Sequence, residues 1–304
     1  MLLTANCNWR TGNSWVKYSN NPVLGGSLGT CFDVCLLEVG NSYWMWFSWR
    51  LRKSIALTRS LDGIHWSRPE IVLRPNTDTG WELQVNRPAL LFRDGLYHMW
   101  FTGQTPTNSA IGYARSTDGI NWQRARATPV LSPVSAWEGV AVMAPNVLWD
   151  QDQKLYRMWY SGGEQYEPNA VGYATSTDGL SWERRADNPI LRPDPGSVWE
   201  SARVTAAQVL KHGAYYYAFY IGFSDVDHAA IGLGRSLDGI TNWVRHPDNP
   251  IIRPGEFGWD SSACYKPFAI FTRGRWMLWY NGRRDHAEQI GLATRDAEDL
   301  GFPE

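Results

Sequence analysis

The sequence predicts an all-β protein, a five-bladed β-propeller with four antiparallel strands in each blade. Two observations carry this prediction: a repeat with a fixed period, and four strand-like segments in each repeat. The Asp-Gly pairs of the repeat stand at Asp62, Asp118, Asp178 and Asp238, spaced 56, 60 and 60 residues apart. Such a period is typical of repeat architectures, and four strands per unit around a ring describe a propeller blade. We expect residues 1–304 to form one such domain.

The repeat is clearest at residues 171–182, VGYATSTDGLSW, and related segments stand at 55–66, 111–122 and 231–243. In each segment an apolar run is followed by Asp-Gly and then by Trp. Glycine supplies the positive φ that a tight turn needs, and aspartate hydrogen-bonds its own backbone, so the segment predicts a strand, a turn and a strand. Because this aspartate recurs on four blades, we interpret it as a turn residue and not as a catalytic one.

Each repeat also contains an apolar first strand and an aromatic second strand. The second strands begin at Tyr43, Tyr97, Tyr156, Tyr216 and Trp276. Five such strands predict five blades, but the last blade lacks a fourth strand after Ile290. A segment of the expected kind, WVKYSNNPVL, stands instead at residues 15–24. We therefore expect residues near 13 to 24 to pair with the strand near Ile290 and to close the ring as its outer strand.

The overall composition excludes some classes of function. The chain has 304 residues and a formal net charge of -1, which gives no case for a surface that binds nucleic acid or membranes. No stretch reaches the length of a membrane span, and we expect a soluble, cytoplasmic protein. The 18 tryptophans mostly occupy repeated positions, which indicates aromatic packing between sheets.

The cysteines are too few and too irregularly spaced for a disulfide framework or a paired zinc motif. They are Cys7, Cys31, Cys35 and Cys264. We expect buried free thiols, no metal site and no cofactor.

Propeller geometry predicts where a ligand binds. Because strand direction alternates within a blade, the loop after the second strand and the loop entering the next blade lie at one end, which we call the mouth. Ligand sites form where the innermost strands converge at such an end, and we expect a small-molecule or oligosaccharide substrate there. The candidate substrate-binding residues of the mouth are Arg50, Asn86, Arg87, Asn146, Arg203, Asp225, Lys266 and Arg283.

Two kinds of acidic residue face the mouth. A Trp-Glu or Trp-Asp pair recurs at Glu82, Glu138, Glu200 and Asp260, and repetition favours a structural hydrogen-bond acceptor. Blade one lacks the pair and carries Asp33 among apolar neighbours. An acidic side chain in an apolar inner strand is unfavourable unless it is paired or used, so Asp33 is the leading catalytic candidate.

Three basic candidates come from three different blades, namely Arg87, Arg203 and Lys266. If they converge, they suit an anionic group, such as a carboxylate-bearing sugar or a phosphate. Alternatively, they neutralise the acidic residues of the mouth.

The repeats S-T-D-G-hydrophobic-x-W and N-P-V/I-L, together with NRPALLF and APNVLWD, make the chain resemble the five-bladed propeller glycosidases. These comprise glycoside hydrolase families 43, 32 and 68 and the family 130 mannoside phosphorylases. In families 43 and 32 the resemblance implies an Asp on blade one, an Asp on blade two and a Glu on blade three as the catalytic set. Asp33 matches the first. Arg87 stands where the second is expected, and Ala144 with Pro145 leaves the third place without a glutamate.

The resemblance implies an enzyme that cleaves a glycosidic bond. The leading interpretation is a glycoside hydrolase with Asp33 as base or nucleophile and Glu138 or Glu164 as acid. One alternative is a phosphorylase or a glycosyltransferase on the same fold, in which phosphate or another acceptor replaces water and the basic residues bind the anion. A second alternative is a carbohydrate-binding propeller without catalytic activity.

Overall fold

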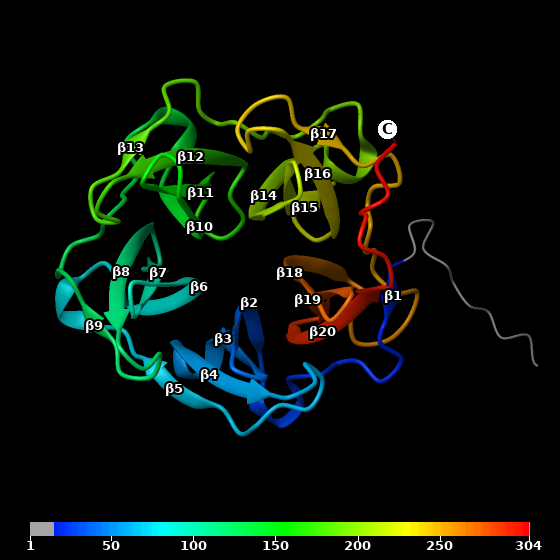
Figure 1. Ribbon diagram of the computed structural model, residues 1–304, viewed down its shortest axis with the longest axis horizontal. Coiled ribbons are helices and arrows are strands. Elements are labelled where there is room, and N and C mark those ends of the chain that lie inside the picture. Colours follow the sequence, from blue (N-terminus) through cyan, green and yellow to red (C-terminus); the bar gives the residue numbers. More distant parts are fainter. Residues whose placement is uncertain (1–14, 304) are drawn as a thin grey trace, which may run out of the picture.

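The computed structural model describes residues 15–303, and its strands form five antiparallel blades around a centre (Figure 1). The first strand of each blade, β2, β6, β10, β14 or β18, faces the centre. A single parallel bridge between Ala141 and Ser109 joins the sheets of the second and third blades. The predicted five-bladed all-β fold is therefore confirmed.

The strands follow the order expected from the repeats. Blade one contains β2 (Cys31–Val39), β3 (Ser42–Trp49), β4 (Ser54–Ser60) and β5 (Glu70–Leu73), and blade two contains β6 (Gln84–Arg93), β7 (Leu96–Gln104), β8 (Ser109–Ser116) and β9 (Gln123–Arg124). Blade three contains β10 (Ala141–Asp150), β11 (Leu155–Gly163), β12 (Ala170–Ser176) and β13 (Glu183–Arg184), and blade four contains β14 (Arg203–His212), β15 (Tyr215–Phe223), β16 (Ala229–Ser236) and β17 (Val244–Arg245). Blade five contains β18 (Ala263–Thr272), β19 (Arg275–Arg284), β20 (Ala287–Arg295) and, from the N-terminal part of the chain, β1 (Val16–Lys17).

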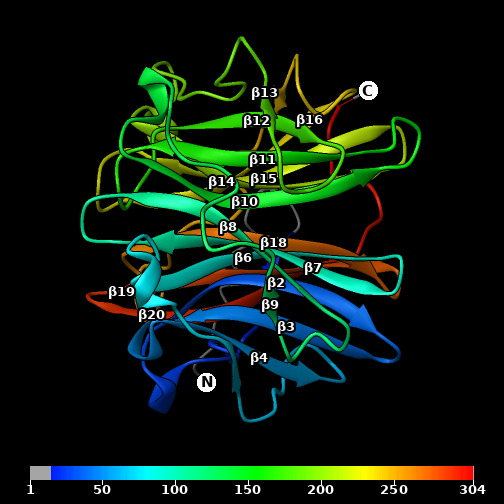
Figure 2. The same cartoon turned by 90° about the vertical axis from the view of Figure 1, so that its left-hand side faces the viewer.

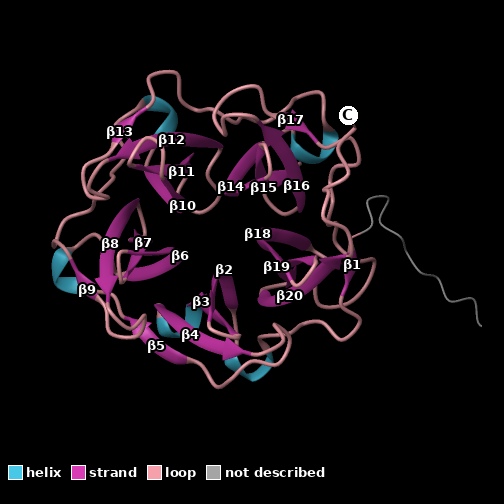
Figure 3. Cartoon of the chain, in the orientation of Figure 1, coloured by secondary structure: helices cyan, strands magenta, loops and turns pink. Residues whose placement is uncertain are grey.

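Helical structure in the described residues is confined to single turns in loops (Figure 3). These are η1 (Gly26–Leu28), η2 (Arg50–Arg52), η3 (Thr77–Thr79), η4 (Ala136–Glu138) and η5 (Val198–Glu200). Within residues 15–303, none of the helices has the length and apolar character of a membrane span.

The ring is closed as the sequence predicted, for the part of the predicted segment that the structure describes. Val16 pairs with Thr294 and Lys17 with Ala293, so β1 is the outer strand of blade five. Farther along, a bridge joins Leu24 to Ile290. Residues 13 and 14 and Cys7 lie outside the described residues.

The Asp-Gly turns act as scaffold, as expected. Asp118 Oδ1 accepts hydrogen bonds from the Ile120 and Asn121 amides, and the corresponding aspartates of the other blades do the same in their turns. The glycine of the turn also contacts the preceding blade, since Trp46 Nε1 donates a hydrogen bond to the Gly119 carbonyl at 3.1 Å. A Cβ at Gly119 would lie 3.1 Å from the Trp46 ring, and its φ is 74°, so only glycine fits without strain. These turns lie at the end of the strands opposite the loops of the mouth (Figure 2).

The buried aromatic side chains of the second strands pack between neighbouring blades, which confirms the interpretation of the repeated tryptophans. Trp46, Trp100, Trp159 and Trp279 are at most 1% exposed. Each donates its indole N–H to the turn glycine of an adjacent blade, at distances from 2.7 to 3.1 Å. Large apolar rings with a satisfied polar atom stabilise such an interface without leaving an unpaired donor.

In each of four blades, a buried ion pair joins the outer strand to the loop that leads into the inner strand, and we call it the clasp. In blade three, Arg184 Nε lies 2.7 Å from Glu138 Oε1, and the same pairing joins Arg124 to Glu82 and Arg245 to Glu200. The N-terminal strand supplies the cation of blade five, where Lys17 Nζ lies 2.6 Å from Asp260 Oδ2. The recurring Trp-Glu and Trp-Asp pairs therefore provide the carboxylates of four structural ion pairs.

The hydrogen bonding of the clasp carboxylate differs between blades. A tyrosine hydroxyl also donates to the carboxylate in blade three (Tyr160 to Glu138, 2.7 Å) and in blade five. Phe101 occupies the corresponding position in blade two, and Glu82 Oε1 has no hydrogen-bond partner. Burial raises the pKa of Glu82, and Arg124 opposes this shift only in part.

We expect Phe101→Tyr to stabilise the protein, because the new hydroxyl would donate to the unpaired Glu82 oxygen. A net gain of about 1 kcal/mol in the free energy of unfolding is expected from one such hydrogen bond, measured by urea denaturation. Tyr160→Phe is the matched control, and it should lose about 1–3 kcal/mol because it leaves a buried Glu138 oxygen with one donor fewer. An unchanged or lower stability of Phe101→Tyr would contradict this account of the clasp.

Candidate functional site

Each inner strand contains a β-bulge near the mouth. The pairing with the second strand shifts register at the same place in all five blades, for example between Phe32 and Cys35 in blade one. The first residue of the bulge has a φ between 47° and 55° in every blade. These residues are Asp33, Arg87, Ala144, Ala206 and Lys266. A bulge re-aims a side chain out of the pleat, so one side chain per blade is directed differently from its neighbours.

The positive φ of these residues is unfavourable, because this backbone conformation costs about 1–2 kcal/mol for a residue other than glycine. A polar side chain of the preceding blade compensates by accepting a hydrogen bond from the bulge amide. Asn281 Oδ1 accepts from the Asp33 amide at 3.1 Å, and Ser48 Oγ accepts from the Arg87 amide at 2.9 Å. In the same way, Thr102 accepts a hydrogen bond from the Ala144 amide and Ser161 accepts one from the Ala206 amide. Neighbouring blades therefore fix the positions of the site residues.

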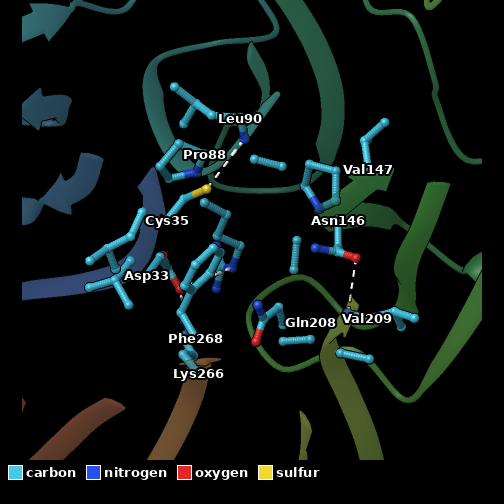
Figure 4. Close-up of a pocket in the computed structure, with 18 of the residues that line it drawn as sticks. Asp33, Cys35, Pro88, Leu90, Asn146, Val147, Gln208, Val209, Lys266 and Phe268 are labelled. Carbon is cyan, nitrogen blue, oxygen red and sulfur yellow. Dashed lines mark hydrogen bonds and ion pairs between the residues drawn. The ribbon is translucent and has the colours of Figure 1, made fainter. Parts of the chain in front are cut away.

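The five bulges surround a pocket of about 220 Å³ (Figure 4). Deeper parts of its wall are mostly apolar and include Leu36, Leu90, Val147 and Val209. The bulge side chains divide the pocket into two sides. Blades five, one and two contribute charged groups, whereas Ala144 and Ala206 of blades three and four contribute only methyl groups. The space beside the two alanines is therefore where a ligand has room next to the charged groups.

The charged side of the pocket is a cluster of three buried side chains, Asp33, Lys266 and Arg87, each at most 8% exposed. Lys266 Nζ lies 2.9 Å from Asp33 Oδ1, and Arg87 Nε lies 3.9 Å from the same oxygen. Ser48 Oγ donates to Asp33 Oδ2 at 3.1 Å. Two cations face one carboxylate, so the cluster has a net positive charge when Asp33 is ionised. Sequence reasoning had singled out all three charged residues, and the structure brings them together.

The two predicted asparagines, Asn86 and Asn146, form hydrogen bonds with other groups of the protein. Asn86 Nδ2 donates to Gln104 Oε1 at 2.9 Å, and its own Oδ1 accepts from Arg87 Nη1 at 3.0 Å, which helps to orient the guanidinium group. Asn146 lines the pocket, and its Oδ1 accepts from the Val209 amide at 2.9 Å.

Three other predicted residues do not line the pocket. Arg50 Nη2 pairs with Glu288 Oε2 at 2.7 Å, and Arg283 Nη2 donates to the Asp227 carbonyl at 2.6 Å. Asp225 is exposed and accepts hydrogen bonds from its own loop, including one from the Asp227 amide at 2.9 Å. The neutralisation of acidic groups therefore accounts for Arg50, and loop structure accounts for Arg283 and Asp225.

The position of Glu138 does not allow the role of catalytic acid that was expected for it. It is completely buried in the clasp of blade three, away from the residues that line the pocket. Burial alone would raise the pKa of Glu138, but hydrogen bonds from the Ser135 and Val134 amides and from Arg184 lower it below its ordinary value. An ionised, enclosed carboxylate cannot reach a substrate or donate a proton, and its position gives Glu138 the structural role of Glu82.

Glu164 lies in a loop above the pocket and pairs with Arg203, the first residue of β14. Arg203 Nη2 lies 3.0 Å from Glu164 Oε2, and the Glu164 side chain is 65% exposed. This loop, residues 164–169, joins β11 to β12. Glu164 is therefore at the mouth, as expected, but points to solvent rather than into the enclosed part of the site.

Sequence reasoning missed a carboxylate in the same loop. Glu167 is half-buried and interacts electrostatically with Lys266, Arg87 and Asp33. Burial raises its pKa, although Lys266 and Arg87 oppose the shift. The only signal in the sequence was its place in the loop after a second strand, where the exposed Glu164 was chosen instead.

The cysteines of the described residues are free and buried thiols, as expected. Burial raises the pKa of Cys31 and of Cys35 to about 12, so neither thiol is poised as a nucleophile. Within residues 15–303, no group of three or more His, Cys, Asp and Glu side chains is arranged to hold a metal ion.

Comparison with solved structures shows that this fold is shared. A structure from the family 130 mannoside phosphorylases, from work on glycoside hydrolases that target β-1,2 mannosidic linkages in Candida mannan, superposes with a TM-score of 0.77. It is 15% identical and covers 98% of this chain and 97% of its own. A thermostable family 43 glycoside hydrolase superposes with a TM-score of 0.71 at 17% identity, covering 90% of this chain and 91% of its own.

Sequence comparison also relates this chain to enzymes that act on glycosidic bonds. A 1,2-β-oligomannan phosphorylase from a Thermoanaerobacter species is 27% identical over 241 residues, which are 75% of each chain. The family model of the glycosyl hydrolases family 32 N-terminal domain matches residues 41–224, more than half of the chain. This protein therefore belongs to the glycosyl hydrolase family 32 N-terminal domain family, within the superfamily of five-bladed propeller glycosidases.

Proposed function

We propose that this protein cleaves a glycosidic bond of an oligosaccharide in the central pocket, with inorganic phosphate as the attacking nucleophile. The observation that supports the proposal most is the pairing of two buried cations, Lys266 and Arg87, with the single carboxylate Asp33. Phosphate needs cationic donors, which a lysine supplies as a point charge and an arginine as a planar fork. A buried cluster with an excess positive charge suits such an anion.

The hydrogen bonding of Asp33 favours phosphate over water. Hydrolysis with inversion requires a carboxylate that accepts a proton from water, with room for that water. Both oxygens of Asp33 already accept hydrogen bonds or ion pairs, Oδ1 from Lys266 and Oδ2 from Ser48. In the proposed reaction Asp33 therefore holds the two cations in place and faces the sugar, and it does not activate the nucleophile.

The substrate class that we propose is a β-1,2-linked mannooligosaccharide. A relative at 27% identity is named as a 1,2-β-oligomannan phosphorylase. The pocket is open beside Ala144 and Ala206, where a sugar ring would lie against methyl groups and next to the charged cluster.

Hydrolysis is the second candidate. Here Asp33 acts as base or nucleophile and a carboxylate of the loop at residues 164–169 acts as acid. This candidate is favoured by the contacts of Asp33 with Lys266 and Ser48, which orient its carboxyl group at the pocket, and by a structural neighbour from a family that contains glycoside hydrolases.

We expect purified protein to release sugar phosphate from β-1,2-mannooligosaccharides only when inorganic phosphate is present. Lys266→Met and Arg87→Met should each raise the KM for phosphate at least about 10-fold, the equivalent of one charge-assisted hydrogen bond. Arg126→Gln, on the exposed outer surface, is the matched control and should leave this KM unchanged. Chromatography with detection of sugar phosphates checks the result. Free sugar released equally with and without phosphate would favour hydrolysis, and binding without cleavage would favour a carbohydrate-binding protein.

We expect Asp33→Asn to lower kcat/KM at least about 100-fold, a typical loss when one preorganised electrostatic group is removed. The amide keeps the shape of the carboxylate but cannot neutralise Lys266 and Arg87. Asp187→Asn is a suitable control, because Asp187 forms an exposed ion pair with Arg185 outside the pocket. Steady-state kinetics on the same oligosaccharide measures the effect. Full activity of Asp33→Asn would show that the Asp33 carboxylate has no role in the reaction.

A further inference from the structure

Ser48 lies on β3, at a position that recurs on the second strand of every blade. The residue at this position pairs with the inner-strand residue that precedes the bulge, as Ser48 does with Phe32. In four of the five blades its side chain accepts a hydrogen bond from the bulge amide of the next blade. Ser48 accepts from the Arg87 amide at 2.9 Å. It therefore holds the backbone that carries one of the two cations of the cluster.

Ser48 also contacts the charged bulge residue of its own blade. Its Oγ donates to Asp33 Oδ2 at 3.1 Å. A backbone amide can only donate, so the hydroxyl oxygen accepts from Arg87 and its single proton is left for Asp33. The direction of both hydrogen bonds is therefore fixed. Because Ser48 is 1% exposed, bulk water does not compete for either of them.

The corresponding residues of the other blades have different partners. Thr102 and Ser161 hold the bulges of two alanines, which carry no charge. The side-chain amide of Asn281 donates to a backbone carbonyl of blade one, and Ile221 of blade four has no polar atom in its side chain. Within residues 15–303, Ser48 is therefore the residue at this position that joins two members of the charged cluster.

The contacts of Asp33 show what the hydroxyl group adds. Lys266 Nζ lies 2.9 Å from Oδ1 and Arg87 Nε lies 3.9 Å from the same oxygen, whereas Ser48 contacts Oδ2. The last torsion of an aspartate side chain has a broad distribution, so contacts to both oxygens are needed to fix the plane of the carboxylate. Without Ser48 only Oδ1 would be held, and the group would be free to turn about it.

We propose that Ser48 is a positioning residue of the reaction, whose one hydroxyl group sets both the plane of the Asp33 carboxylate and the place of Arg87. This proposal rests on the proposed function, in which Asp33 faces the sugar and Arg87 binds phosphate. Ser48 is not among the residues that line the pocket, so it acts through these two side chains. A misplacement of about 1 Å in the site can lower a rate about 100-fold, although no reacting group has been removed.

The test compares Ser48→Ala with the matched variant Ser161→Ala. Each removes one hydroxyl acceptor from a bulge amide, so urea denaturation should show similar losses of stability. Ser48→Ala should lower kcat/KM on a β-1,2-mannooligosaccharide by about 10- to 100-fold and raise the KM for phosphate. Ser161→Ala should lower kcat/KM less than about 3-fold, because the bulge that it holds carries no charged group to misplace.

We expect Ser48→Ala to fold, because the bulge of Lys266 forms opposite Ile221 without a side-chain acceptor and still has a φ of 51°. Ser48→Thr keeps the hydroxyl group and should recover most of the activity, since Thr102 has the corresponding role in blade two. Ser48→Cys is a milder variant, because a thiol donates and accepts only weakly. Its activity should lie between those of Ser48→Ala and wild type, and full activity would contradict the proposal.

Equal losses of activity in Ser48→Ala and Ser161→Ala would overturn the proposal, because the effect would then be that of any bulge hydrogen bond. A crystal structure of Ser48→Ala is a second measurement, independent of the reaction. We expect displaced positions for Asp33 Oδ2 and the Arg87 guanidinium group, and unchanged positions would also overturn the proposal. If the wild-type protein cleaves no β-1,2-mannooligosaccharide, with or without phosphate, the proposed function fails, whereas the crystal structure still tests the role of Ser48. The two failures are therefore distinguishable.

Discussion

The site depends on one repeated interaction, the hydrogen bond between a polar side chain of one blade and the bulge amide of the next. It stabilises a backbone conformation that is costly for any side chain other than glycine. Asn281, Ser48, Thr102 and Ser161 accept these hydrogen bonds. Blade four has Ile221 at the corresponding place, a side chain that accepts none. Because the bulges of Asp33 and Arg87 are each held by the preceding blade, the positions of these two residues depend on neighbouring blades and not on one blade alone.

The two ends of the propeller separate structure from chemistry. At the end opposite the mouth, the Asp-Gly turns and the tryptophans that contact them repeat with the same partners from blade to blade. The bulge positions have the same backbone in all five blades but carry an acid, two bases and two alanines. The pocket is therefore asymmetric, although the scaffold around it repeats five times.

The fold and part of the site could be predicted from sequence. Repeat spacing gave the blades, and the missing outer strand predicted the contribution of residues near Val16. Asp33 was found because a charge in an apolar inner strand is rare and costly, and Arg87 and Lys266 were found because propeller geometry put them at the mouth on different blades. Glu138 and Glu167 could not be separated in this way, since both lie in loops where a carboxylate is ordinary. What distinguishes them is that Glu138 contacts Arg184, whereas Glu167 forms no ion pair with a described residue, and this depends on packing between segments distant in the sequence.

The contact between Asp33 and Lys266 joins the first blade to the last. As the chain is synthesised, Asp33 emerges early, while Lys266 follows only after the three intervening inner strands, β6, β10 and β14, have been made. An incomplete chain would therefore hold an unneutralised carboxylate in an apolar strand and would lack its catalytic cluster. Assembly of the charged cluster is thus coupled to completion of the ring.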